Sequence, residues 1–316
     1  MATDEPSYNP ERTKSWLICT ACGTQFPTAD RQELKTCFIC DDPRQFTPQT
    51  GQAFTTLDEI RSGFKNTWVP FTNDDRLVSI FTEPKLGIGQ RAILIKTPVG
   101  NVLWDCITLI DPETIDKIKG LGGLRAIVIS HPHYYTTHVE WALAFNCPVY
   151  LAAEDKQWTT QRSSRQVFVE ETELDLHIDD SPLGVKLLKL GGHFPGSFVA
   201  LFDKRLLIAD TLVSTPSGLG SWDTDAVGNA RARPTGMNSY SFMWSIPNMI
   251  PLSPNELERM WSILKKYDFS SSHGAFLGTD IVKTVEEMKR RVLDSMQIQI
   301  KYMGHHDHAF LKETVG

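Results

Sequence analysis

Two histidines one residue apart, His131 and His133, are the first residues of this chain whose types and spacing could do chemistry. They follow residues 126–129, an apolar and β-branched run that is typical of a buried strand, and Pro132 prevents the strand from continuing past them. Side chains at the carboxyl end of a buried strand face the ligand crevice of α/β proteins. Because neutral imidazole is a common zinc ligand, the pair indicates a metal site, although His-x-His alone is a weak signal.

Three further residues with metal-binding side chains stand at the ends of expected strands. His193 lies in a glycine-rich turn, Asp210 ends the second strand of an expected hairpin, and His273 ends a last short strand. A single histidine in such a place is more often a core residue with local hydrogen bonds than a ligand. Five ligand-type residues at strand ends weaken that interpretation and favour a shared metal centre.

Four cysteines form a second candidate metal site near the N-terminus. They occur as two Cys-x-x-Cys pairs with fourteen residues between the pairs: Cys19, Cys22, Cys37 and Cys40. Two matched pairs at this spacing predict a zinc ribbon, in which four thiolates close a tetrahedral shell. A closed shell has no open coordination position, so this zinc is expected to be structural, with a redox dithiol as the alternative. Cys106 and Cys147 stand alone in apolar surroundings and are expected to be buried and inert.

Composition restricts the classes of protein to consider. The chain has 316 residues, of which 41% are hydrophobic and 22% are charged, as is ordinary for a soluble globular protein. The net charge of -6 argues against a nucleic-acid partner or an anionic membrane surface. No apolar run approaches the roughly 18 residues that span a bilayer, and the polar N-terminus lacks a secretory apolar segment. We therefore expect a cytoplasmic protein that acts on a small molecule, and the oligomeric state stays open.

The order of expected elements divides the chain into a small module and a large domain. The expected parts are a terminal arm (1–15), the zinc ribbon (16–45), a connector (46–76), a large main domain (77–304) and a tail (305–316). Helices are expected at 56–65, 112–119, 136–145, 254–266 and 280–300, with strands and hairpins between them. Residues 213–237 show little periodicity, and a loop of this length is usually functional. This loop is expected to lie over the site, with Trp222 in contact with substrate.

Over residues 77–300 these residues and their order resemble the metallo-β-lactamase superfamily. The resemblance implies an α+β fold, the αββα sandwich, with metals at one edge between two sheets. The family's first motif, His-x-His-x-Asp-His, falls on His131, His133, Tyr135 and Thr136. Its later ligands fall on His193, Asp210 and His273. With the four-cysteine module ahead of it, the chain resembles fungal lactam hydrolases that open the γ-lactam ring of benzoxazolinones.

Two departures from that family pattern bear on the number of metals. Tyr135 and Thr136 stand where the family has an aspartate and a histidine that serve a second metal. The resemblance therefore implies one zinc bound by three histidines, and a weaker second ion at Asp210 and His273. His138 could join that second site or be a structural histidine. We expect one structural zinc and one or two catalytic zincs.

The resemblance also implies the reaction. A zinc-bound hydroxide would attack the carbonyl of a small cyclic amide or ester, in a lactam or lactone ring opening that could detoxify xenobiotics. Asp210 would orient the water or act as a further ligand, and Tyr135 or Tyr134 would donate a proton. Tyr134 is also a candidate substrate contact. The alternatives are a thioesterase on the same fold and a non-enzymatic metal-binding protein whose second metal site has decayed.

Overall fold

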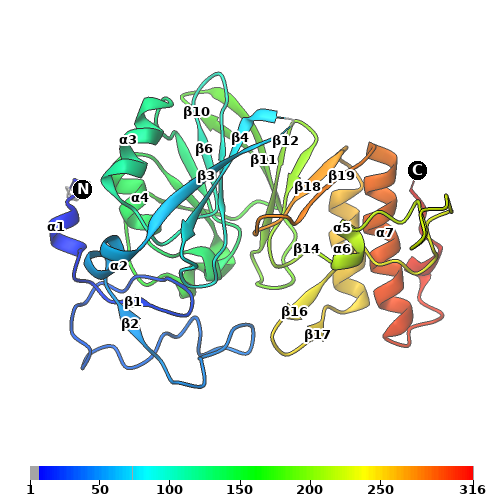
Figure 1. Cartoon of the computed structure of the whole chain (residues 1–316), viewed down its shortest axis with the longest axis horizontal. Coiled ribbons are helices and arrows are strands. Elements are labelled where there is room, and N and C mark those ends of the chain that lie inside the picture. Colours follow the sequence, from blue (N-terminus) through cyan, green and yellow to red (C-terminus); the bar gives the residue numbers. More distant parts are fainter. Residues whose placement is uncertain (1–6, 73, 316) are drawn as a thin grey trace.

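Two β-sheets pack face to face between two layers of helices in the computed structural model, which describes residues 7–72 and 74–315 (Figure 1). Within the described residues the first sheet has seven strands in the order of the chain, and the second has six. The first sheet contains β3 (Lys65–Phe71), β4 (Asp74–Glu83), β5 (Ala92–Ile95), β6 (Val102–Trp104), β7 (Ala126–Val128), β8 (Val149–Ala152) and β9 (Gln166–Val169). The second contains β10 (Glu173–Ile178), β11 (Ser181–Lys189), β12 (Phe198–Phe202), β13 (Arg205–Leu207), β18 (Ser271–His273) and β19 (Asp280–Val282).

The direction of the strands brings several carboxyl ends to one edge of the sandwich. In the first sheet β3 to β6 run antiparallel, whereas β6, β7, β8 and β9 are parallel to one another. In the second sheet β13 and β18 are the parallel pair. Loops that follow parallel strands leave the sheet at the same edge, so β6 and β7 deliver their next residues side by side.

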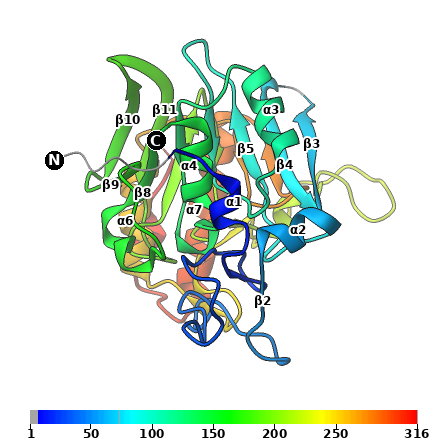
Figure 2. The same ribbon diagram turned by 90° about the vertical axis from the view of Figure 1, so that its left-hand side faces the viewer.

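Alternating side chains explain why both faces of the first sheet are buried. On β5, Ile93 and Ile95 point into the core between the sheets, whereas Ala92 and Leu94 face the outer helices. Successive strand residues point to opposite faces, so a continuous apolar run is what a doubly covered strand requires. The helices on this face are α3 (Pro112–Gly120) and α4 (His138–Phe145) (Figure 2).

The second sheet is covered by α6 (Pro254–Leu264) and α7 (Val285–Tyr302) (Figure 1). Leu187 and Leu207 face the core between the sheets, while Leu188 and Leu206 face these helices. Ser253 caps α6 through a capping box with Glu256, as sequence patterns of this type predict. No helix among the described residues has the length and hydropathy needed to cross a bilayer.

The remaining elements are short and connect the ribbon and the loops to the sandwich. They are α1 (Pro10–Thr13), β1 (Ile18–Cys19), β2 (Phe54–Thr55), α2 (Leu57–Gly63), β14 (Val213–Ser214), α5 (Pro216–Leu219), β15 (Tyr240–Ser241), β16 (Met243–Ser245), β17 (Ile250–Pro251), and the 3-10 turns Pro132–Tyr134, Ala153–Trp158 and Ala309–Lys312. The ribbon lies below the first sheet in Figure 1, and the β16–β17 hairpin lies at the same lower edge.

The predicted α+β sandwich is confirmed, and several of its element boundaries are corrected. The helix expected over residues 280–300 was wrong at its start, because Asp280–Val282 forms β19 and the helix begins at Val285 after its N-cap Thr284. Within the expected connector, Lys65–Phe71 forms β3 and pairs with β4. In the expected tail, Phe310 is buried in the core beside α7.

Candidate metal centre

Three histidines and one aspartate, His131, His133, His193 and Asp210, meet at one edge of the sandwich, beyond the ends of β7, β11 and β13. Oδ2 of Asp210 lies 3.5 Å from Nε2 of His131 and 3.8 Å from Nδ1 of His133. Nε2 of His193 lies 3.8 Å from the same oxygen and 3.1 Å from Nδ1 of His133. With zinc–nitrogen bonds of about 2.0–2.1 Å, the edges of a tetrahedral shell are about 3.3–3.4 Å long. The spacing of the four atoms therefore fits one tetrahedral metal ion.

Strand ends and one glycine turn place these four residues. His131 and His133 leave β7 through the 3-10 turn Pro132–Tyr134, and Asp210 follows β13. His193 lies in the turn between β11 and β12, where Gly192 has a φ of +90°. A Cβ atom on Gly192 would lie 2.7 Å from a methyl carbon of Leu252, so this position requires glycine on both counts.

Hydrogen bonds orient two of the imidazole rings toward the common centre. Nδ1 of His193 donates to the carbonyl of Trp244 at 2.9 Å, and Nδ1 of His131 shares a hydrogen bond of 2.9 Å with the hydroxyl of Ser130. Each bond leaves Nε2 facing Asp210. Nε2 of His131 is buried and has no hydrogen-bond partner, which is costly unless a metal ion uses its lone pair.

The protonation states of the cluster also suit a metal. Burial chiefly, with a smaller effect of the nearby Arg44 charge, lowers the pKa of His133 and His193 to about 4. Burial alone would raise the pKa of Asp210, but the neighbouring histidines lower it well below its ordinary value. The imidazoles are therefore neutral and the carboxylate is ionised at neutral pH, as metal ligands must be.

Tyr134 supports Asp210 from behind the cluster. Its hydroxyl donates to Oδ1 of Asp210 at 2.8 Å, and its ring centroid lies 4.4 Å from that of His131. Tyr134 was predicted as a substrate contact or proton donor, and the structure places it, fully buried, as a partner of Asp210.

Asp105 is a supporting residue that the sequence analysis missed. Its Oδ1 accepts the N–H of Ser130 at 2.7 Å, so it holds the residue whose hydroxyl contacts His131. Burial raises the pKa of Asp105 to about 7. A signal was present: Asp105 directly follows β6, which runs parallel to β7, so both strands end at one edge. The mostly apolar run 102–109 resembles one continuous strand and hid that signal, whereas β6 ends at Trp104.

Tyr135 and His138 are close in sequence to the cluster but lie outside it. The Tyr135 hydroxyl makes a long hydrogen bond of 3.4 Å to the carbonyl of Asp155. Nδ1 of His138 bonds to the Tyr135 carbonyl at 2.8 Å, and its Nε2 lies 2.9 Å from the amide nitrogen of Gln166. Neither side chain adds a ligand to the four.

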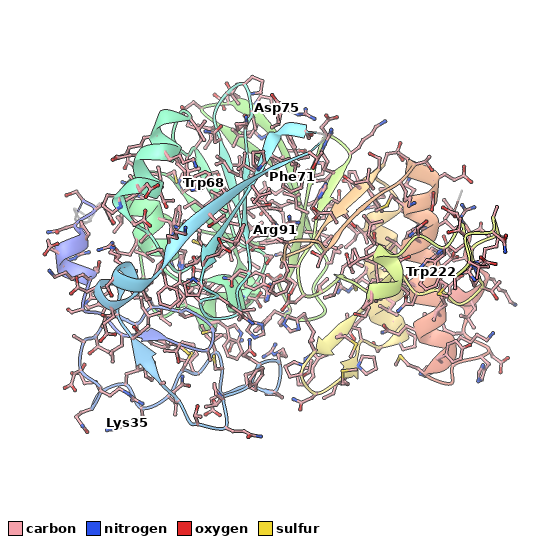
Figure 3. The ribbon with its side chains drawn as sticks, in the orientation of Figure 1. Lys35, Trp68, Phe71, Asp75, Arg91 and Trp222 are labelled. Carbon is pink, nitrogen blue, oxygen red and sulfur yellow. The ribbon has the colours of Figure 1, made fainter. Side chains whose placement is uncertain are left out.

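His273 is not brought into the cluster either, although it was predicted as a ligand. Its Nε2 lies 2.9 Å from the hydroxyl of Ser271, and its Nδ1 lies 3.3 Å from Oδ1 of Asp280. Its ring packs edge-on against Phe71 at 4.8 Å, and Asp280 also pairs with Arg91. His273 and these neighbours form a group separate from the metal cluster, and Figure 3 labels two of them, Phe71 and Arg91. The expected second metal at Asp210 and His273 is therefore not formed in this geometry.

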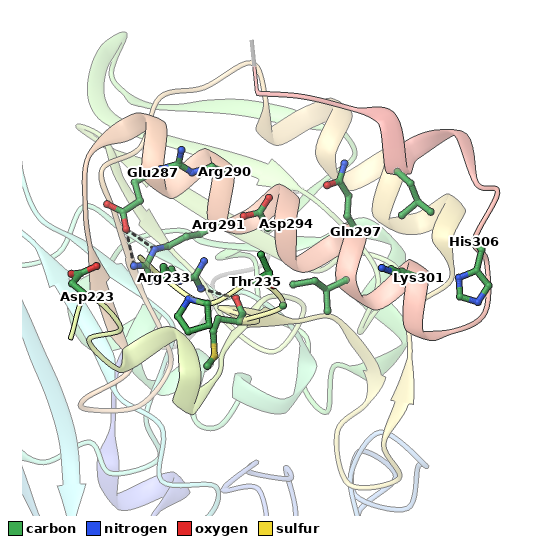
Figure 4. A pocket seen from close by; sticks show the side chains of 15 residues that line it. Asp223, Arg233, Thr235, Glu287, Arg290, Arg291, Asp294, Gln297, Lys301 and His306 are labelled. Carbon is green, nitrogen blue, oxygen red and sulfur yellow. Dashed lines mark hydrogen bonds and ion pairs between the residues drawn. The ribbon is translucent and has the colours of Figure 1, made fainter. Parts of the chain in front are cut away.

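The loop expected to cover the site lies elsewhere as well. Trp222 sits beside α5 and α7, at the right of Figure 3, and donates to the carbonyl of Ser217. The loop is held there because the backbone N–H groups of Ser239 and Tyr240 donate to Ser295 on α7. Together with α7 the loop lines a cavity of about 930 Å³, and none of the lining residues belongs to the metal cluster (Figure 4).

The four ribbon cysteines form a second group that fits a metal. The Sγ atoms of Cys19 and Cys40 are 3.6 Å apart, and those of Cys22 and Cys37 are 3.8 Å apart. Zinc–sulfur bonds of about 2.3 Å give tetrahedral edges of about 3.8 Å, so this group also fits one ion. Hydrogen bonds among the thiols lower the pKa of Cys19 and raise that of Cys22, so the four cannot all ionise without a cation.

The two other cysteines are buried and free, as predicted. Burial raises the pKa of both thiols, Cys106 and Cys147, to about 12. The thiols are therefore protonated and unreactive at neutral pH.

Comparison with known proteins gives one substantial sequence relative. The uncharacterized protein YmaE of Bacillus subtilis (strain 168) is 38% identical over 262 residues, which cover 83% of this chain and 88% of the relative. No protein-family model matches the chain.

Solved structures with partial similarity include metallo-β-lactamases. A DIM-1 metallo-β-lactamase exposed to ceftazidime has a TM-score of 0.47 and 11% identity, covering 74% of this chain and 97% of that one. A B3 metallo-β-lactamase with an active-site glutamic acid has a TM-score of 0.44 and 13% identity, covering 85% and 99%. A flavo di-iron protein variant from Thermotoga maritima has a TM-score of 0.46 and 12% identity, covering 74% of this chain but only 62% of that longer chain.

Proposed function

The chain belongs to the same family as YmaE of Bacillus subtilis, and from that premise and the geometry of the cluster we propose that it is a metal-dependent hydrolase. The observation that carries the proposal is the spacing of the four ligand atoms, with Asp210 3.5 to 3.8 Å from each imidazole nitrogen. Neutral imidazoles and an ionised carboxylate support the same conclusion.

We propose that the ion is zinc and that the histidine–aspartate cluster binds one zinc ion. Three nitrogens and one oxygen at tetrahedral spacing match the ligands that zinc prefers. A second ion in the cluster would need further ligands, and both Tyr135 and His273 are occupied elsewhere. A zinc ion bound here would activate a water molecule and polarise a substrate carbonyl.

The chain's own residues would then position the reactants. Tyr134 holds Oδ1 of Asp210, which leaves Oδ2 facing the three imidazoles. Asp210 is the most exposed of the four ligands at 9%, so solvent and substrate reach the cluster beside its carboxylate. His131, His133 and His193 would hold the ion, and Asp210 would complete its shell or orient a water molecule beside it.

The rings around the cluster favour a small and fairly apolar substrate. Phe194 contacts all three histidine rings at centroid distances of 4.9 to 5.7 Å, and Trp158 packs against Phe194 at 5.5 Å. We therefore propose a small cyclic amide or ester as substrate, opened at its carbonyl. Detoxification of a lactam, including a benzoxazolinone, is the specific form of this proposal that the family resemblance suggests.

Metal analysis combined with a substrate panel tests the proposal. Elemental analysis of the full chain is expected to give two zincs per chain, one in the ribbon and one in the cluster. A chromogenic lactam, an aryl ester and an acyl thioester are then compared as substrates. His133→Ala is expected to lose the cluster zinc and turnover, whereas His177→Ala, at an exposed position, is expected to keep both.

Each other outcome points to a different function. Faster turnover of the thioester than of the lactam or the ester would replace the proposal with a thioesterase. Full metal content without turnover of any of the three would favour a non-enzymatic metal-binding protein. A wild-type chain that binds a single zinc, in the ribbon, would refute the metal centre itself.

A further inference from the structure

The segment that follows the last ribbon cysteine reaches the metal centre. The guanidinium carbon of Arg44 lies 4.1 Å from the ring centroid of Phe194 and 5.1 Å from that of Trp158. Nη1 of Arg44 lies 3.5 Å from the carbonyl oxygen of His193. Arg44 is therefore in contact with the turn that carries one of the four ligands, although it is 149 positions away from His193 in the chain.

Asp42 fixes the orientation of Arg44. Nε and Nη2 of Arg44 donate to the two carboxylate oxygens of Asp42 at 2.8 and 2.9 Å. The two side chains are only 11% and 12% exposed. A two-point hydrogen bond of this kind holds the guanidinium plane rigidly and leaves its flat face for the Phe194 ring.

The same segment also holds the hairpin that orients His193. The carbonyl of Pro43 accepts a hydrogen bond from the side-chain amide of Asn248 at 2.7 Å and another from the Ser245 hydroxyl. Ser245 ends β16, next to Trp244, whose carbonyl accepts the Nδ1 proton of His193. Figure 1 shows the ribbon and the β16–β17 hairpin meeting at the lower edge of the molecule.

The contacts of Arg44 and Pro43 reach His193 from two sides. Arg44 packs against the turn that carries His193. Pro43 binds the hairpin whose Trp244 carbonyl accepts the hydrogen bond from Nδ1 of His193. Both contacts come from adjacent residues of the ribbon module, whose fold depends on the four cysteines. A metal ligand held by outer hydrogen bonds loses about 10–100-fold in metal affinity when such a partner is removed.

We propose that Arg44 is a positioning residue for His193, so that the folded ribbon sets the metal affinity of the histidine–aspartate cluster. The inference deepens the proposed function, because it rests on metal binding at that cluster. It gives the ribbon a role beyond stability: it supplies one wall of the metal centre. It also makes loading of the cluster depend on loading of the ribbon.

Cobalt titration of the full-length protein tests the inference without any substrate. Cobalt(II) bound to thiolates gives intense charge-transfer bands, whereas cobalt(II) bound to nitrogen and oxygen gives weaker ligand-field bands, so the two sites are followed separately. The variants are Arg44→Ala, Arg44→Lys and Asp42→Asn. The matched control is Arg31→Ala, because Arg31 of the ribbon also stacks on an aromatic ring, that of Phe54 in β2 at 4.4 Å, which is not part of the metal centre.

Arg44→Ala is expected to weaken cobalt binding at the cluster about 10–100-fold and to leave the thiolate bands unchanged. Arg44→Lys keeps the charge without the two-point bond, so an intermediate affinity is expected. Arg31→Ala is expected to match the wild type at both sites. If Arg44→Ala does not fold, as judged by near-ultraviolet circular dichroism, Asp42→Asn decides, and a loss of affinity at the cluster is expected for it as well.

Two results would overturn the inference. The first is a cobalt affinity of the cluster in folded Arg44→Ala that stays within about twofold of the wild type, well short of the loss that removal of an outer partner causes. Where Asp42→Asn decides, the same result in that variant would overturn the inference. The other is an equal loss in Arg31→Ala, which would mean that any damage to the ribbon has the same effect. Absence of ligand-field bands in the wild type would instead refute the metal centre, and with it the proposed function, so the two failures are distinguishable.

Discussion

Replacement of Tyr134 by phenylalanine tests whether Asp210 needs its hydrogen bond to serve as a ligand. The Tyr134 hydroxyl donates to Oδ1 of Asp210 at 2.8 Å, and burial raises the pKa of this phenol far above its ordinary value. The group is therefore a protonated donor at every working pH. Phenylalanine keeps the ring that packs against His131 at 4.4 Å and removes only the donor.

Two independent estimates give the size of the effect. A hydrogen bond to a charged acceptor contributes about 1.5–3 kcal/mol. Loss of a hydrogen bond to a metal ligand costs about 10–100-fold in affinity, which corresponds to about 1.4–2.7 kcal/mol. Both estimates apply because the donor belongs to Tyr134, which is fully buried on the Oδ1 side of Asp210, so water does not take the place of the lost hydroxyl. Tyr134→Phe is expected to raise the zinc dissociation constant of the cluster by that factor.

Tyr135→Phe is the matched control for this experiment. Tyr135 is the next residue in the chain and is equally buried, but its hydroxyl makes only a 3.4 Å bond to the carbonyl of Asp155. Zinc affinity is measured by competition with a chromogenic chelator, with the ribbon zinc as an internal reference. Equal affinities for Tyr134→Phe and wild type would refute the reasoning. A loss confined to Tyr135→Phe would restore that residue to the site.

Other variants test the ribbon, the excluded histidine and the pH dependence of stability. Cys37→Ser is expected to lose the ribbon zinc and unfold at a lower temperature in a thermal melt; unchanged zinc content and melting temperature would contradict a structural ribbon. His273→Ala is expected to keep the cluster zinc, because its ring bonds to Ser271, and loss of one zinc per chain in elemental analysis would make it a ligand after all. Burial raises the pKa of Asp155 to about 7 in the folded chain, so this group contributes stability that is present at low pH and is lost as the pH rises through about 7. In the wild type the free energy of unfolding is expected to decline from about pH 4 to about pH 8, and Asp155→Asn is expected to remove roughly 2–4 kcal/mol of that decline. Urea denaturation at each pH measures it, and an unaltered decline in the variant would mean that Asp155 does not titrate in this range.

The ligand residues could be predicted from the sequence because their signals are local. His131 and His133 follow an apolar run, and a strand that ends at a proline leaves them at the sheet edge. The four cysteines carry their geometry in their spacing, which the close approach of their sulfur atoms bears out. In both cases a short stretch of chain fixes the direction of the side chains.

His273 shows where this reasoning fails. It stands at the end of a strand, as the ligands do, but β18 pairs with β13 so that His273 lies opposite Leu207. Asp210 comes three residues after Leu207, which is about 10 Å of extended chain. His273 is therefore too deep in the sheet to reach the cluster. The register between two strands whose paired residues are 66 positions apart depends on tertiary packing and cannot be predicted from either strand alone.

Arg44 and Asp42 were missed for a related reason. Both residues follow the ribbon cysteines, and the aromatic partners of Arg44, Phe194 and Trp244, lie far along the chain. A bidentate arginine–aspartate pair two residues apart is visible in the sequence, but its position is set by how the ribbon docks on the sandwich. The ribbon zinc was expected to be structural, and the contacts of Pro43 identify the hairpin that the ribbon module holds.

Tyr135 and Thr136, where the chain differs from the motif that its sequence resembles, lie in a segment that contacts the ribbon. Thr136 has a φ of +40°, and its carbonyl accepts the N–H of Gln25 from the ribbon at 3.1 Å. The next residue, Thr137, bonds through its hydroxyl to the carbonyl of Thr108, and the Thr108 hydroxyl in turn donates to the carbonyl of Gly23. The segment that would carry ligands for a second metal thus holds the ribbon in place. Tyr135→Asp is therefore not expected to create a second site, because the backbone next to it is hydrogen-bonded to the ribbon, and a third metal ion per chain in elemental analysis would contradict this explanation.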